Sequence, residues 1–150
     1  MSTSRGREPA GAPPLTSARR RARERALALL YEAEAKAVPP EAVLRELPVS
    51  AEPYAAVLVE GVSRRQREID ALIADKARGW PLERMAVIDR AVLRLGVYEL
   101  LEQRDVPFAV VLDEAVELAK QYSTEDSGRF VNGILAALAA DLRALEVHPT

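Results

Sequence analysis

The chain has 150 residues, of which 49% are hydrophobic and 5% aromatic, and its net charge is −2. This length suits one domain with a single core. The absence of cysteine excludes disulfides, thiolate nucleophiles and zinc sites that need sulfur ligands. No signal-peptide core and no apolar run of membrane-spanning length is evident, so we predict a cytoplasmic protein.

The charge is unevenly distributed along the chain. Residues 1–25 contain seven arginines and two glutamates, a net charge of +5, so the remaining 125 residues carry −7. A local excess of positive charge attracts anionic ligands even when the total is close to zero. We therefore expect an anionic partner at the N-terminal end of the domain.

Residues 1–16 are rich in Ser, Gly, Pro and Ala and lack periodicity, which predicts a flexible tail. Ser17 is the expected N-cap of a helix that runs to about Ala37 and ends before Pro39 and Pro40. Apolar residues at helical spacing predict its inward face, which comprises Ala22, Ala26, Leu29, Leu30 and Ala33.

A short helix is expected over residues 41–47, and another starts near Ser50. Ser63 resembles the first residue of a capping box, which predicts a new helix over residues 64–77, closed by Gly79-Trp80-Pro81. The inward faces of these two longer helices are expected to comprise Tyr54, Val57, Leu58, Gly61, Val62, Ile69, Leu72 and Ile73.

From Leu82 to about Leu100, the pattern predicts a short turn and then a longer helix. Two further helices are expected over residues 110–122 and 127–145, separated by a polar stretch, and residues 146–150 form a tail. No strand pattern competes, so we predict an all-α fold, a compact bundle of about seven helices in one domain over residues 17–145.

The strongest local signal is a cluster of five arginines, which comprises Arg19, Arg20, Arg21, Arg23 and Arg25. Cations at a helix N-terminus oppose the macrodipole and cost about 0.3–1 kcal/mol each. A cluster that is locally unfavourable in this way indicates a functional site. Guanidinium groups suit contacts with phosphates and bases. The cluster therefore indicates nucleic-acid binding rather than a merely solvated face, and Tyr31 lies on roughly the same side.

An enzyme is the alternative suggested by the neighbouring acids Asp113, Glu114 and Glu117. However, no second catalytic group accompanies them, and the lone histidine, His148, lies in the terminal tail. The glycines form no phosphate-binding loop. We predict a protein that is not an enzyme and that has no metal site and no cofactor.

Several segments resemble the family of the transcription antitermination factor NusB, in its order and spacing. The matching segments are residues 18–31, 89–94, 98–100, 113–120 and 129–135. The resemblance implies an all-helical fold of seven helices and a role in bacterial transcription of ribosomal RNA operons. It also implies three partners: boxA-type single-stranded RNA, the ribosomal protein NusE, and an antitermination complex on RNA polymerase.

Site residues follow from the same resemblance. RNA contacts are expected at Arg19, Arg20, Arg21, Arg23, Tyr31, Asp126, Arg129 and Phe130. The resemblance thus adds an RNA role for Phe130, which helical spacing alone places on a core face with Ile134 and Leu138. Exposed acidic contacts with NusE are expected at Glu83 and Asp89. Family members often carry a bulkier residue or proline at position 128, where this chain has glycine.

Two other interpretations share features with this one. RNA cytosine methyltransferases carry a NusB-like domain, but they also need a strand-rich region and a nucleophilic cysteine, and this chain has neither. A non-catalytic interaction module could instead use its arginines to bind an acidic protein. The periodicity is compatible with either a monomer or a homodimer.

Overall fold

The computed structural model describes residues 15–147, and within this range every regular element is a helix. The elements in chain order are α1 (Leu15–Lys36), α2 (Pro40–Arg45), α3 (Pro53–Ala77), the 3-10 turn η1 (Leu82–Arg84), α4 (Val87–Glu102), α5 (Phe108–Tyr122), α6 (Glu125–Leu142) and α7 (Ala144–Val147). The predicted all-α fold is confirmed. Residues 1–14 and 148–150 of the two predicted tails lie outside the described range.

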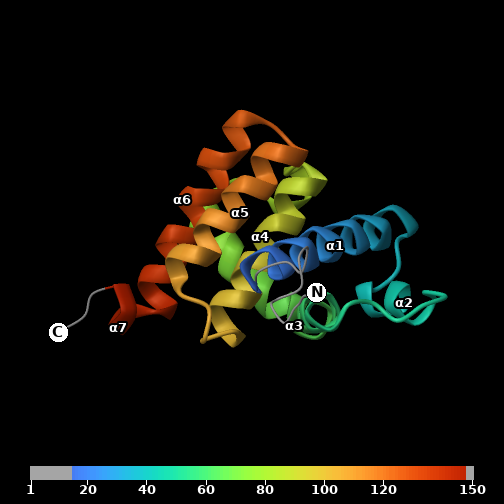
Figure 1. The fold of residues 1–150 in the computed structure, drawn as a ribbon. Helices are drawn as coiled ribbons and strands as arrows, with labels where there is room; N and C mark the ends of the chain where they lie inside the picture. The colour runs from blue at the N-terminus through green and yellow to red at the C-terminus, as the bar shows by residue number, and fades with distance from the viewer. Residues whose placement is uncertain (1–14, 148–150) are drawn as a thin grey trace, which may run out of the picture.

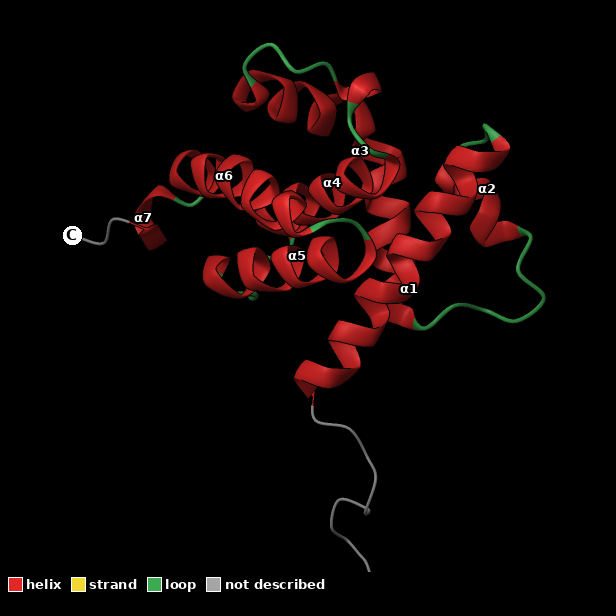
Figure 2. Ribbon diagram, turned by 90° about the horizontal axis from the view of Figure 1, so that it is seen from above, coloured by secondary structure: helices red, strands yellow, loops and turns green. Residues whose placement is uncertain are grey.

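The helices form two groups joined by α4. α2 packs against α1 and α3, α5 packs against α6, and α4 contacts α1, α3, α5 and α6. Figure 1 shows α5 and α6 side by side with α4 behind them, and Figure 2 shows α1 running across their direction. α1 therefore lies where its side chains can reach both α4 and α5.

α4 is the central helix of the core. Between Asp89 and Leu100, every residue except Arg94 is buried. The five apolar residues predicted to face inward from α1 are all buried, as are Leu58, Val62, Ile69 and Ile73 of α3. Tyr54 and Leu72 are partly buried against the core, whereas Val57, also predicted to face inward, is exposed.

Two predicted helices are one in the structure. α3 continues past Ser63, with a kink at Arg65, where φ is −110° and ψ is 19°. The Ser63 hydroxyl accepts a hydrogen bond from the Glu41 N–H at 3.4 Å, which ties α3 to α2. Because the hydroxyl bonds to another helix, it does not start a new one. The total of seven α-helices in the described range still agrees with the prediction, since α7 replaces the lost one.

Three predicted helix starts were too late. α5, expected from residue 110, begins at Phe108. α1 begins at Leu15, so Ser17 lies inside it and is not its N-cap. α6 begins at Glu125, because Thr124 accepts the Ser127 N–H and Ser127 reciprocates in a capping box. Glu125 and Asp126 thereby fall in the first turn, where the helix dipole stabilises negative charge.

Gly61 sets the distance between α3 and α4. A Cβ at this position would overlap the ring of the buried Tyr98. We expect Gly61→Ala to lower the free energy of unfolding by about 1–3 kcal/mol, because the packed ring must move. Gly133→Ala is the matched control on α6, where a Cβ meets nothing within 4 Å and the change should stabilise by up to about 1 kcal/mol. Urea unfolding measures both, and equal effects would contradict the proposed contact.

Candidate nucleic-acid interface

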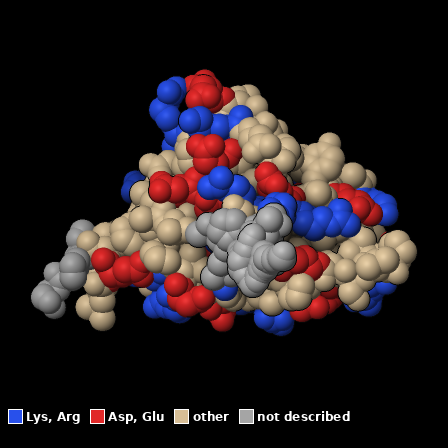
Figure 3. Space-filling model, in the orientation of Figure 1, with Lys and Arg blue, Asp and Glu red and all other residues tan. Residues whose placement is uncertain are grey.

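The five clustered arginines of α1 divide into exposed, paired and buried groups. Arg21 and Arg25 lie one turn apart and are exposed, with no ion pair to any described residue. Arg19 is partly covered: its guanidinium carbon lies 4.3 Å from the centre of the Tyr54 ring, and its Nη2 is 3.4 Å from the Asp105 carboxylate. The basic side chains over α1 are flanked by acidic ones (Figure 3).

Arg20 is exposed but engaged in a bidentate ion pair. Its Nε and Nη2 donate hydrogen bonds to the two carboxylate oxygens of Glu114, at 3.0 Å and 2.6 Å. This hydrogen bonding, together with the opposite charge, raises the pKa of the Arg20 guanidinium. The pair joins the arginine cluster of α1 to the acidic side of α5.

Arg23 points into the core rather than toward solvent. Only 4% of its side chain is exposed, and its guanidinium donates three hydrogen bonds, of 2.9 to 3.1 Å, to the equally buried carboxylate of Glu99. The Tyr54 hydroxyl donates a further bond of 2.5 Å to Glu99. Burial is the largest cause of a raised pKa at Tyr54. Arg23 was expected among the RNA contacts, but in this arrangement its guanidinium faces α4.

The start of α6 carries the other expected RNA contacts. Asp126 and Arg129 form an ion pair and are both highly exposed. Phe130 is half-buried and meets Trp80 edge to face, with ring centroids 6.4 Å apart. Phe130 thus combines a packing contact with partial exposure. Trp80 was not among the predicted site residues, because the sequence showed it only as part of a helix breaker.

A surface groove of about 660 Å³ brings the two expected RNA-binding segments together. Arg20 of α1 and Arg129 of α6 both line it, with Lys120 of α5 between these helices in the chain. Gly128 keeps α5 close, since a Cβ there would meet Lys120 Cγ at 2.9 Å. A bulkier residue at position 128 would have to displace Lys120. Tyr31 is exposed further along α1 and does not line this groove.

The two residues expected to contact NusE differ in exposure. Glu83 lies in η1 and is exposed. Asp89 is only 9% exposed, and its Oδ2 accepts a hydrogen bond of 3.0 Å from the Ser127 hydroxyl. Its expected position on the surface is therefore wrong. The reason is that position 89 of the central helix faces the capped start of α6, where Ser127 lies.

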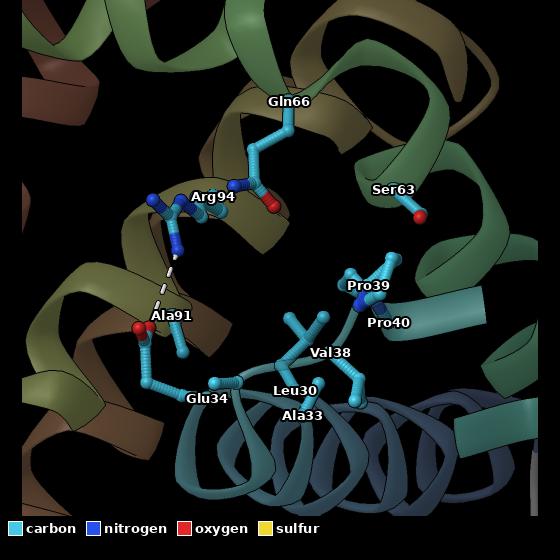
Figure 4. Close-up of a pocket in the computed structure, with 11 residues that line it drawn as sticks. Leu30, Ala33, Glu34, Val38, Pro39, Pro40, Ser63, Gln66, Ala91 and Arg94 are labelled. Atoms are coloured by element: carbon cyan, nitrogen blue, oxygen red, sulfur yellow. Dashed lines mark ion pairs between the residues drawn. The ribbon is translucent and has the colours of Figure 1, made fainter. Parts of the chain in front are cut away.

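A separate cavity of about 410 Å³ lies between the end of α1, α3 and α4 (Figure 4). Its charged groups already have partners, because Glu34 pairs with Arg94 at 3.6 Å and Arg94 pairs with Asp70 at 2.8 Å. No residue expected in the site lines it. The cavity therefore belongs to the packing of the bundle rather than to the arginine surface.

Two further findings concern residues 15–147. No group of three or more His, Asp or Glu side chains is placed to hold a metal ion. In the same range, none of the helices combines the length and the apolarity needed to cross a membrane.

The described residues define the class, which is an all-helical protein with an arginine-rich surface on α1. The sequence matches the NusB family over residues 20–140, and the chain belongs to this family. It is 45% identical over 127 residues to the transcription antitermination protein NusB of Kineococcus radiotolerans, covering 82% of this chain and 93% of that one. For the protein of the same name from Saccharopolyspora erythraea, identity is 50% over 129 residues, covering 81% and 86%.

Solved structures agree with this assignment. NusB of T. maritima has a TM-score of 0.75 and 40% identity, covering 82% of this chain and 91% of that one. The structure of the antitermination factors NusB and NusE in complex with dsRNA contains a chain with a TM-score of 0.70 and 31% identity, covering 82% and 96%.

Proposed function

We propose that this chain is a non-catalytic, cytoplasmic antitermination factor that binds boxA-type RNA of ribosomal RNA operon leaders together with NusE, as part of a complex on RNA polymerase. The observation that carries the proposal is the groove lined by Arg20 and Arg129, together with the exposed Arg21 and Arg25 on the same helix as Arg20. Membership of the NusB family supports it. So does the related structure in which NusB, NusE and RNA occur together.

Within this proposal, the exposed residues contact RNA. The arginines of α1 bind phosphates, because guanidinium groups match their geometry and charge. Tyr31 and Phe130 offer aromatic faces on which bases can stack. Asp126 and Arg129 extend the surface at the start of α6, while Arg23 holds α1 in position through Glu99. The proposed contact set is therefore Arg19, Arg20, Arg21, Arg25, Tyr31, Asp126, Arg129 and Phe130.

Glu83 is the proposed contact with NusE that is most accessible to test. Glu83→Lys should weaken the binding of purified NusE by about tenfold, because the reversed charge disfavours the same partner surface. Glu60→Lys makes the same charge change at an exposed position of α3 and is the control. Isothermal titration calorimetry measures both, and equal affinities for Glu83→Lys and the parent protein would remove Glu83 from the interface.

The RNA part is tested by titrating a labelled leader RNA with and without NusE. We expect modest binding by the chain alone and tighter binding with NusE, because a second protein enlarges a small RNA-binding surface. Equal RNA affinities would mean that the two ligands are not coupled. A chain that binds NusE or another acidic protein but no RNA would instead be an interaction module.

A further inference from the structure

Glu114 pairs with Arg20, one of the two arginines that line the groove. Both of its oxygens accept hydrogen bonds from Arg20, and only 13% of its side chain is exposed, against 57% for Arg20. Its Oε1 also lies 3.7 Å from Nη1 of the buried Arg23, which Glu99 holds in the core. The Glu114 carboxylate is therefore held close to the core by Arg23. The Arg20 guanidinium is exposed to solvent and can exchange one partner for another.

The other cations of the groove are paired as well. Lys120 Nζ lies 3.6 Å from Glu125, and Arg129 pairs with Asp126. Carboxylates on α5 and α6 thus balance the positive charge of this surface, and Figure 3 shows acidic and basic side chains mixed over these helices. A phosphate that enters the groove therefore meets cations that are already paired with carboxylates.

We propose that Glu114 limits the affinity of the RNA site by competing with phosphate for Arg20. The inference rests on the proposed function, and it adds a residue whose role is to restrain binding. A carboxylate and a phosphate both accept a bidentate guanidinium, so the Nε and Nη2 edge of Arg20 serves one of them at a time. Phosphate contacts carry no sequence information, so weakening one lowers affinity for arbitrary RNA and leaves discrimination to contacts with bases.

The test compares Glu114→Gln with Glu117→Gln, using a fluorescein-labelled uridine 12-mer as a probe of arbitrary sequence. Both variants remove one negative charge from α5, but Glu117 is exposed and forms no ion pair with a described residue. Releasing an exposed ion pair of ordinary strength corresponds to about a twofold to fivefold gain in affinity. We expect this gain for Glu114→Gln and a smaller one for Glu117→Gln, which changes only the general field.

A double-mutant cycle separates competition from general electrostatics. If Glu114 acts through Arg20, Glu114→Gln has no effect beyond that of Glu117→Gln when Arg20→Ala is also present. Glu114→Asp keeps the charge on a shorter side chain, loosens the bidentate contact and should give an intermediate affinity. Thermal midpoints of all variants, measured by circular dichroism, show whether each is folded at the assay temperature.

Several results would overturn the inference. Weaker binding by Glu114→Gln would mean that Glu114 presents Arg20 to RNA instead of withholding it. Equal gains for Glu114→Gln and Glu117→Gln, or a gain that persists with Arg20→Ala, would show that pairing is irrelevant. If the parent protein bound neither this RNA nor leader RNA, the proposed function itself would fail. Tight binding by the parent with no response to Glu114→Gln would remove only the competition.

Discussion

Replacing Arg23 with methionine is expected to lower the free energy of unfolding by about 3–5 kcal/mol, because it leaves the Glu99 carboxylate buried without its main partner. Glu99 is 2% exposed, so water does not compensate the loss. Urea unfolding followed by circular dichroism measures the effect. Arg25→Met is the matched control on the same helix, and since Arg25 is exposed, its change should stay within about 0.5 kcal/mol.

A double variant tests whether the buried, unpaired Glu99 carboxylate causes this loss of stability. Replacing both partners, Arg23→Met with Glu99→Leu, should recover most of the stability, because no uncompensated charge remains in the core. At a temperature where all variants are folded, RNA affinity should stay within about twofold of the parent. Full stability with lost RNA binding in Arg23→Met would show instead that Arg23 leaves the core to contact RNA.

The triple variant Arg20→Ala, Arg21→Ala and Arg25→Ala should show the largest effect on RNA binding. If each of these three arginines engages one phosphate, together they contribute about −2.1 to the slope of the logarithm of affinity against the logarithm of salt, from −0.7 per contact on a single strand. Between 50 and 200 mM salt, this slope corresponds to about a twentyfold loss of affinity. The triple variant should lose this salt dependence, and each single change should make the slope shallower by about 0.7.

A second triple variant is the control for the loss of three positive charges. Arg45, Arg64 and Arg67 are exposed arginines of α2 and α3, and changing them to alanine removes the same total charge. We expect this control to keep the slope of the parent. An α1 variant that bound leader RNA with the affinity and slope of the parent would show that the arginine helix is not the RNA surface.

An arginine that reads or stacks on a base behaves differently from one that binds phosphate. Its loss lowers affinity but hardly changes the salt slope. Arg19 is the position where this distinction matters most, because its guanidinium already lies over the Tyr54 ring and faces Asp105.

The sequence by itself determined the fold class and the buried faces of most helices. Leu29 and Ile73 lie at helical spacing among other apolar residues, and burial of such a stripe is the main stabilising contribution of a helix in a bundle. The arginine cluster was equally visible, because its composition and its position at a helix start are local properties. Helix boundaries were predicted less accurately: Ser63 has the local form of an N-cap, yet its hydroxyl accepts a hydrogen bond from Glu41 of another helix.

Only the tertiary structure decided which charged residues remain available. Arg20 and Arg23 are three positions apart in one cluster, but they meet carboxylates 94 and 76 positions away in the chain. Those partners come from α5 and α4, and local spacing does not specify how these helices cross α1. The same reason applies to Asp89, which the packing of α4 against α6 turns toward Ser127 and away from solvent. Local pattern determines which residues carry charge, and the packing of helices determines whether that charge faces a ligand, an ion-pair partner or the core.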